Sequence, residues 1–324
     1  MDIGFRLPQG PVDPVELAER AEALGYSSVW AGELWGVDAF VTLARVAAAT
    51  DRLGLGTAIV NVYSRTPAAL AMAAATLADA GGGRVHLGLG ASTERAIEGL
   101  HGLAFDRPVR RSHETAAIVR RVLGGDEPVS YDGEVLSVGH VPPLDADVGL
   151  YNAALGPANR RATGRVFDGW LPHNLPLDDL DAAFETVAEA ARGAGRDPDD
   201  IRVAPYVPTA VAADEATARE QVRAHLAYYV GSGAGYRRAV ATRFPDEAAT
   251  IAERWAEGER DRATRAVTEA MVDALGIAGT PETARDRFLA LGDRASLDEP
   301  LVVPAGTPDA DRVWRTLEAI APDG

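Results

Sequence analysis

The sequence predicts an α/β protein in which one (β/α)8 barrel, a TIM barrel, extends over residues 1–324. The first observation behind this prediction is a regular alternation of short apolar runs, typical of buried strands, with stretches of helical periodicity. The second is the segment 53–92, where a helix-length crossover joins two apolar runs, as parallel strands of one sheet require. No internal repeat or low-complexity linker interrupts the alternation, so we expect a single domain.

The expected strands are short and apolar on both faces, because helices cover both faces of a parallel sheet. Helices carry start and stop signals: Pro14 and Pro67 stand at first helical positions, and Gly25 and Gly81 follow the last turns. We expect strands at residues 2–7, 27–31, 53–60, 84–89, 148–154, 167–171, 201–211 and 299–303. We expect barrel helices at residues 14–24, 38–49, 67–80, 109–123, 158–165, 177–192, 281–291 and 308–320.

Two segments do not fit the alternation and are expected as insertions. Residues 128–143 alternate around Asp132–Gly133, which is the pattern of a β-hairpin, and they precede the next buried run. Residues 214–275 are helical throughout, which is too long for one barrel helix. We assign the surplus, residues 231–275, to a helical insertion before the eighth strand.

Composition excludes several classes of function. The chain has no cysteine, so it has no disulfide framework, thiolate nucleophile or cysteine-ligated metal. Its six histidines form no HxH or HExxH motif, so we expect no metal site. No basic stripe is visible, which argues against a nucleic-acid partner. No apolar run has the length of a membrane span and the amino terminus lacks a signal-peptide pattern, so we expect a cytoplasmic protein without a membrane partner.

The charge balance predicts an unusual environment. The net charge is −16, all 32 basic residues are arginine, and 48 residues are acidic. A high-GC genome would replace lysine by arginine but would not by itself produce this excess of acid. At molar salt, charges are screened over about 3 Å, which removes the self-repulsion of such a surface. We therefore expect a halophilic protein from a haloarchaeon.

Two strings at the ends of the third and fourth expected strands, GTAIVNVYSRTP and GGRVHLGLGAS, resemble the luciferase-like flavin and deazaflavin oxidoreductases. Within that superfamily the chain is similar to the coenzyme F420-dependent methylenetetrahydromethanopterin-reductase type, and YNAALGPANRRATGRVFDGW extends the resemblance beyond one motif. The resemblance covers the whole chain. It implies a bulge after the third strand that backs the ring system of the cofactor, with a non-proline cis peptide at Ala58–Ile59 and with Val60 and Asn61 completing the bulge.

The other expected cofactor contacts lie at two further strand ends, because barrel active sites form at the carboxyl ends of the strands. Small neutral groups there suit a planar cofactor held by backbone atoms. After the fourth strand these groups are Gly90, Ala91 and Ser92, and after the fifth they are Ala154, Leu155, Gly156 and Pro157.

A helix begins directly at the second of these strand ends, and Arg160 or Arg161 lies one turn further on. Free N–H groups and the helix dipole favour an anion there. The resemblance implies that this loop receives the cofactor phosphate. The alternative is an ordinary turn between strand and helix.

Three side chains are expected on the substrate side. In many deazaflavin relatives the second strand ends in Asp-His, and the histidine is a substrate-side acid or base; here Gly32 and Glu33 occupy the two positions. A carboxyl group can replace the histidine if burial disfavours its charged form, and we expect Leu34 and Trp35 to provide that burial. We therefore take Glu33 as the catalytic candidate, with a solvated loop carboxylate as the alternative. Trp35 is either a wall of the substrate pocket or simple packing, and His173 is a strand-end residue that can contact substrate.

The resemblance implies an oxidoreductase that transfers a hydride between coenzyme F420 and a small organic substrate, and a homodimeric assembly. Neither the substrate nor the direction of transfer follows from it. A flavin mononucleotide (FMN)-dependent monooxygenase of the same superfamily is one alternative. A non-catalytic flavin-binding protein is another, because the histidine of the relatives is missing. A metal-dependent barrel hydrolase is disfavoured by the absence of ligand spacing.

Overall fold

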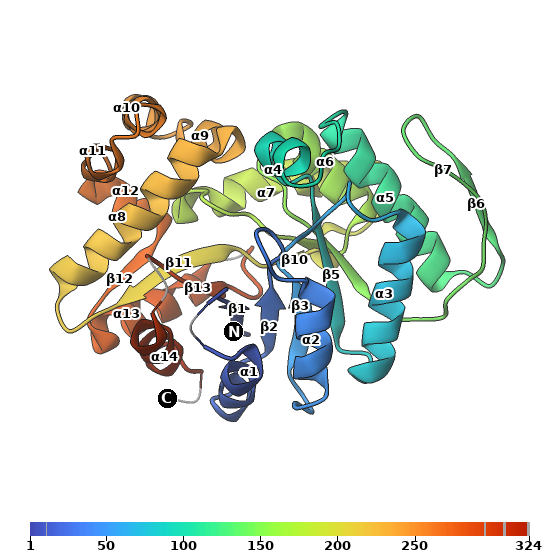
Figure 1. The fold of residues 1–324 in the computed structure, drawn as a ribbon, viewed down its shortest axis with the longest axis horizontal. Helices are drawn as coiled ribbons and strands as arrows, with labels where there is room; N and C mark the ends of the chain where they lie inside the picture. The colour runs from blue at the N-terminus through green and yellow to red at the C-terminus, as the bar shows by residue number, and fades with distance from the viewer. Residues whose placement is uncertain (11, 295, 307–308, 323–324) are drawn as a thin grey trace. The chain divides into compact units, whose positions relative to one another are not determined.

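The computed structural model describes residues 1–10, 12–294, 296–306 and 309–322 (Figure 1). The chain divides into two compact units, each with its own parallel strands and helices. The first unit comprises Met1–Tyr26, Pro172–Glu185 and Val203–Gly324, and the second comprises Ser27–Leu171 and Thr186–Arg202. The expectation of a single domain stays a prediction.

The second unit is built on a parallel sheet with the strand order β9-β8-β5-β3-β2 and with β4 paired to β5. Its strands are β2 (Ser28–Ala31), β3 (Gly54–Thr57), β4 (Val60–Asn61), β5 (Val85–Gly90), β8 (Gly149–Asn152) and β9 (Gly169–Trp170). Its helices are α2 (Ala39–Ala47), α3 (Pro67–Ala80), α4 (Glu94–Gly99), α5 (Pro108–Gly124) and α6 (Pro157–Val166). The 3-10 turn η2 (Pro198–Asp200) follows α7 (Leu180–Gly193).

A glycine in this sheet makes room for the large buried ring of Trp30. Trp30 of β2 is fully buried, and its indole N–H donates a hydrogen bond to Ser28 Oγ at 2.6 Å. A Cβ at Gly56 of the neighbouring strand would lie 2.2 Å from the Trp30 ring, so the strand needs glycine there. The apolar, glycine-containing run in the sequence is therefore a packing requirement of the sheet.

The first unit has a parallel sheet with the order β1-β13-β11-β12. Its strands are β1 (Gly4–Leu7), β11 (Tyr206–Val211), β12 (Ile277–Gly279) and β13 (Leu301–Pro304), and β10 (Arg202–Val203) lies at the boundary of the two units. Its helices are α1 (Pro14–Ala23), α8 (Glu215–Ser232), α9 (Ala234–Val240), α10 (Pro245–Ala256), α11 (Arg260–Arg265), α12 (Glu269–Leu275), α13 (Pro281–Leu289) and α14 (Ala310–Ala319). It also contains the 3-10 turns η1 (Leu177–Asp179) and η3 (Ala290–Asp293).

The helical segment before the last strand forms a small core of its own. Figure 1 shows α9, α10 and α11 gathered beside α8. Buried aliphatic side chains fill the space between these helices and α12, among them Val222, Leu226, Val230, Ile251 and Met271. The helical character predicted for residues 214–275 is confirmed.

The predicted hairpin is confirmed as β6 (Val129–Asp132) paired antiparallel with β7 (Ser137–Val141), and Figure 1 shows it extending past α5. A buried carboxylate on α5 holds its turn. Glu114 accepts hydrogen bonds from the backbone N–H groups of Glu134, Val135 and Leu136 at 2.9, 3.0 and 2.8 Å. These hydrogen bonds, together with the charge of Arg110, lower the pKa of Glu114 against the opposing effect of its burial.

Several predicted boundaries need correction. The third strand, expected at residues 53–60, is interrupted after Thr57 and resumes as β4. The seventh, expected at residues 201–211, is two strands, because Pro205 has no N–H to donate to a neighbouring strand. The short elements α4 and β12 were not predicted. The last helix begins at Ala310, and the expected start at Pro308 lies outside the described residues.

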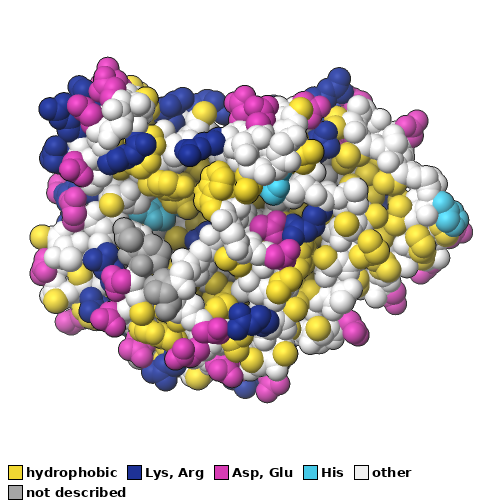
Figure 2. Space-filling model, in the orientation of Figure 1, with side chains coloured by type: hydrophobic (Ala, Val, Ile, Leu, Met, Phe, Trp, Pro, Cys, Tyr) yellow, Lys and Arg dark blue, Asp and Glu magenta, His cyan; other side chains and the backbone are white. Residues whose placement is uncertain are grey.

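Figure 2 shows acidic side chains scattered over the face in view, with arginines among them. Of the helices that the structure describes, none combines the length and apolar character that crossing a membrane requires.

Candidate functional site

The break between β3 and β4 carries the predicted cis peptide bond at Ala58–Ile59. Backbone hydrogen bonds join this bulge to both neighbouring strand ends. Ala58 N–H donates to Ala31 O at 2.8 Å, and Glu33 N–H donates to Ile59 O at 3.3 Å. On the other side Val62 N–H donates to Gly90 O at 3.1 Å. The bulge therefore lies between the loop after β2 and the end of β5.

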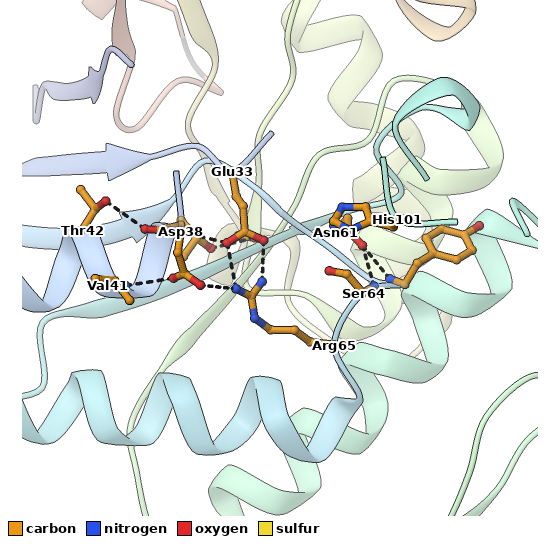
Figure 3. Close-up of polar contacts among 12 residues, drawn as sticks. Glu33, Asp38, Val41, Thr42, Asn61, Ser64, Arg65 and His101 are labelled. Carbon is orange, nitrogen blue, oxygen red and sulfur yellow. Dashed lines mark hydrogen bonds and ion pairs between the residues drawn. The ribbon is translucent and has the colours of Figure 1, made fainter. Parts of the chain in front are cut away.

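Asn61 shapes the chain directly after the bulge (Figure 3). Its side-chain Oδ1 accepts hydrogen bonds from the N–H groups of Tyr63 and Ser64 at 3.0 and 2.8 Å. Its Nδ2 lies 3.2 Å from Nε2 of His101. The contact with His101 was not predicted, because the two residues are 40 positions apart and share no motif.

Glu33 is paired with Arg65, a further residue of the site that the sequence did not single out. The guanidinium contacts both carboxylate oxygens, with N–O distances of 2.5 and 3.0 Å, and it also contacts Asp38 at 2.7 Å (Figure 3). Oε2 of Glu33 accepts a further hydrogen bond from Ala39 N–H at 3.1 Å. Hydrogen bonding to Glu33 raises the pKa of Arg65 above its usual value. Arg65 thus ties the loop after β2 to the segment that follows the bulge.

The burial expected for Glu33 has a different origin from the one predicted. Its side chain is 12% exposed, but Leu34 and Trp35 are 36% and 50% exposed and do not enclose it. The ring of Trp35 lies 5.9 Å from the Arg95 guanidinium of α4. The expectation that Leu34 and Trp35 desolvate the carboxyl is wrong; the assignment of Glu33 as the catalytic residue stays a prediction.

The end of β5 is closely packed against the bulge. A Cβ added at Gly90 would lie 2.9 Å from Cδ1 of Ile59, so a side chain there would force the bulge to move. Ser92 has a positive φ of 60°, which turns the chain sharply after Ala91. Ser64 Oγ is buried and has no hydrogen-bond partner in the described part of the chain. A buried hydroxyl without a partner, three residues after Asn61, fits a ligand that brings polar atoms of its own.

The loop from Ala154 to Pro157 leads directly into α6, with Gly156 as the N-cap and no side chain capping the helix. No atom lies within 4 Å of a Cβ built at Gly156. One turn on, Nε of Arg160 is buried without a partner among the described residues, and the guanidinium lies 5.8 Å from the Trp170 ring. Burial lowers the pKa of Arg160. An uncapped helix start beside a partly desolvated arginine fits a phosphate group.

His173 belongs to the first unit, whereas the other predicted site residues belong to the second. Its Nε2 lies 3.4 Å from Nε2 of His225, and the rings of Tyr229 and Tyr206 pack on it at 4.4 and 5.2 Å. Burial, followed by the charges of His225 and Arg6, lowers its pKa well below the usual value. Burial therefore favours the neutral form of this imidazole.

The strand ends of the second unit offer backbone N–H groups and small side chains, and α6 adds the guanidinium of Arg160. Among the described residues, no three His, Cys, Asp or Glu side chains gather where they could hold a metal ion. These groups can hold and orient a planar, phosphate-bearing cofactor.

Comparison with known proteins gives the same picture. Residues 7–297 match the family model of the luciferase-like monooxygenases. A proposed coenzyme F420-dependent oxidoreductase of Mycobacterium tuberculosis is 30% identical, with 96% of each chain covered. The 5,10-methylenetetrahydromethanopterin reductase of Methanolobus tindarius is 31% identical over 87% of this chain and 89% of its own.

Among solved structures, the coenzyme F420-dependent tetrahydromethanopterin reductase of Methanopyrus kandleri superposes with a TM-score of 0.83 at 25% identity, covering 99% of this chain and 97% of the other. This match confirms the luciferase-like (β/α)8 fold class expected from the alternation of strands and helices. The chain belongs to the luciferase-like monooxygenase family.

Proposed function

We propose that the protein is a coenzyme F420-dependent oxidoreductase that transfers a hydride between the deazaflavin and a small organic substrate. The observation that carries the proposal is the cis bulge at Ala58–Ile59, hydrogen-bonded to the ends of β2 and β5. The relatives that match over most of the chain support it, because they are described as F420-dependent oxidoreductases or as methylenetetrahydromethanopterin reductases.

The residues of the second unit would hold the cofactor at two places. Ala58, Ile59, Val60 and Asn61 would back the ring system, and the strand end at Gly90, Ala91 and Ser92 would border it. The phosphate would bind where α6 begins, at Ala154, Leu155, Gly156 and Pro157, with Arg160 as its cationic partner. When bound, F420 supplies the carbon that accepts or donates the hydride, and the protein orients it and excludes water.

Glu33 is proposed as the acid or base on the substrate side. Its backbone N–H already bonds to the bulge, so its position over the strand ends is well defined. Arg65 and Asp38 orient the carboxylate and limit its rotation. Trp35 is proposed as a wall of the substrate site because it is exposed beside Arg95. His173 is proposed as a second substrate contact.

An FMN-dependent monooxygenase is the second candidate, and the family model itself favours it because that model describes monooxygenases. Oxygen separates the two functions. Reduced FMN enzymes consume O2, whereas a reduced deazaflavin does not activate it. A reduced holoenzyme that stays reduced in air supports F420, and rapid reoxidation in air supports FMN.

The experiment that tests the proposal is a parallel titration of the purified protein with F420 and with FMN, followed by absorbance and fluorescence. We expect saturable binding of F420, weakened about 10- to 100-fold by Arg160→Gln, because a charge-assisted hydrogen bond to phosphate contributes about 1.5–3 kcal/mol. Arg315→Gln, at an exposed position of α14 remote in sequence from every proposed cofactor residue, is the control and should bind F420 like the wild type. Binding of FMN but not F420 would overturn the proposal.

The environment and the oligomeric state of the protein are also proposals. We propose a halophilic enzyme on the basis of the acidic composition. A cytoplasmic location stays a prediction. We propose a homodimer because Val41 of α2 and Met72 of α3 are 63% and 54% exposed on neighbouring helices, and exposed apolar side chains mark interaction surfaces. Light scattering at high salt tests the assembly: a mass of one chain would contradict it.

A further inference from the structure

Arg6 of β1 is a half-buried cation without a counter-charge. Among the residues that the structure describes, none forms a hydrogen bond or an ion pair with its side chain. A guanidinium presents five N–H donors and remains charged, so leaving it partly buried and unpaired is costly. Such a residue calls for an explanation in a chain with 48 acidic residues available to pair with it.

The strand register shows which face of the sheet Arg6 occupies. Phe5, Val302 and Val207 lie level across β1, β13 and β11. Because side chains alternate along strands, Arg6 and Tyr206 point to the opposite face from these three residues. Phe5 packs on Tyr26, at the end of the α1 segment, with the ring centroids 5.6 Å apart, so its face is the helix-covered one. Arg6 and Tyr206 therefore share the face turned away from that helix.

Arg6 is two strands away from Tyr206 and two residues further along, about 12 Å between their backbones, a separation that their long side chains can bridge. The electrostatic influence of Arg6 reaches this group: after burial, it contributes to lowering the pKa of His225 to about 3, and it opposes the rise that burial causes in the pKa of Tyr206. Arg6 therefore lies close to the imidazoles of His173 and His225 and to the phenol of Tyr206.

Other polar groups in this part of the first unit also lack partners. The hydroxyl of Tyr206, whose side chain is only 7% exposed, has no hydrogen-bond partner among the described residues. The same holds for both side-chain atoms of Asn174, which is 2% exposed and has a positive φ of 54°. Tyr206 is bridged to His173, the residue before Asn174, and packs on its ring. The cation and the phenol thus share one face of the sheet with unused donors, and the unpartnered amide belongs to the residue after His173.

We propose that Arg6 binds an anionic group of the substrate, a carboxylate or a phosphate, with Tyr206 and Asn174 donating further hydrogen bonds to it. Planar guanidinium donors match the oxygens of both groups. Tyr206 can add an O–H donor and Asn174 an N–H donor. A bound anion would supply the negative charge that no described residue provides to Arg6. The inference rests on the proposed function in that it names the class of substrate: a small organic acid or phosphate ester.

The test is a titration of the protein, with and without added F420, using acetate and inorganic phosphate at constant ionic strength. Acetamide serves as the neutral counterpart of acetate. Side-chain ¹⁵N signals of His173 and His225 report binding at this cluster. Arg315→Gln, which removes an exposed arginine of α14, is the matched control.

We expect acetate and phosphate to shift both imidazole signals saturably in the wild type and in Arg315→Gln, and acetamide to leave them unchanged. Arg6→Gln should weaken the response at least 10-fold and Arg6→Lys less, because lysine keeps the charge but loses the planar fork. Tyr206→Phe, which keeps the ring, should weaken it several-fold. The F420 affinity of all these variants should equal that of the wild type.

Equal titration curves for Arg6→Gln and wild type would overturn the inference, and so would an equal response to acetamide. If the wild type binds F420 and Arg6→Gln keeps its anion response, only the inference fails. If the Arg6-dependent anion response is present but F420 does not bind, the proposed function fails and the anion site stands alone.

Discussion

Replacing Glu33 by glutamine separates a catalytic carboxyl group from a structural one. The change keeps the size of the side chain and its ability to accept from Ala39 N–H, but it removes the charge that faces Arg65. Glutamine has one oxygen acceptor, so one of the two hydrogen bonds from Arg65 is lost and the amide N–H groups face the guanidinium. Arg65 keeps its contact with Asp38, so the loop stays partly anchored.

The expected cost in stability is modest. A hydrogen bond to a charged group contributes about 1.5–3 kcal/mol when it is shielded from water. The Glu33 and Arg65 side chains are 12% and 23% exposed, so we expect the lower part of that range, about 1.5–2 kcal/mol. For a chain of this size that corresponds to a fall in Tm of about 2–3 °C. General acid–base help is worth about 100-fold or more in rate, so loss of the titrating group should lower kcat by at least that factor.

The assay compares Glu33→Gln with Arg65→Gln, which removes the same ion pair but keeps the carboxyl group. Thermal unfolding measures the structural cost, F420 titration measures cofactor affinity, and turnover at saturating F420 measures chemistry. We expect similar falls in Tm, nearly unchanged F420 affinity, and a much larger loss of turnover in Glu33→Gln. Turnover within about 3-fold of the wild type in Glu33→Gln would refute the catalytic role, since acid–base help is about 100-fold or more. Equal losses of turnover in both variants would make Glu33 a positioning residue that acts through Arg65.

Three further predictions concern stability. Glu114→Ala removes the acceptor of three backbone N–H groups in the hairpin turn, so the free energy of unfolding in urea should fall by about 2–4 kcal/mol and proteases should cleave residues 128–143 faster; an unchanged cleavage rate would contradict this. Burial lowers the pKa of His86 to about 4 in the folded protein. As the pH falls, the unfolded chain therefore protonates this histidine near pH 6.5, before the folded protein does. Stability should therefore decline as pH falls from about 6.5 toward 4, by up to about 1.4 kcal/mol per pH unit for this group, and His86→Phe should flatten that decline. With a net charge of −16, Tm should rise from about 0.1 to 2 M salt, and a level or falling Tm would contradict the halophilic assignment.

Local patterns predicted what depends on local structure. The glycine-rich, apolar runs around Gly56 and Gly90 predicted the strands β3 and β5. The resemblance predicted the cis bond at Ala58–Ile59, where the structure has it. Helix starts at Pro14 and Pro67 followed from the missing N–H of proline. Elements as short as β12 and α4 were not predicted, because three to six residues are too few to show a helical or strand periodicity of apolar residues.

Contacts between distant segments could not be predicted in the same way. Arg65 reaches Glu33 across 32 positions, and His101 reaches Asn61 across 40, through long side chains whose direction no local period specifies. The burial of Glu33 was inferred from its apolar neighbours, yet adjacent loop residues point outward and the enclosure comes from an ion pair instead. Arg6 was overlooked for a related reason: only the strand register shows that it faces away from the helices.

The measurement that tests the account most directly is an experimental structure of the protein with F420 bound. The account predicts the deazaflavin ring against Ala58–Asn61, bordered by Gly90, and the phosphate at the start of α6 within hydrogen-bond distance of Arg160. A cofactor ring that makes no contact with the bulge, or a phosphate placed away from α6, would contradict it.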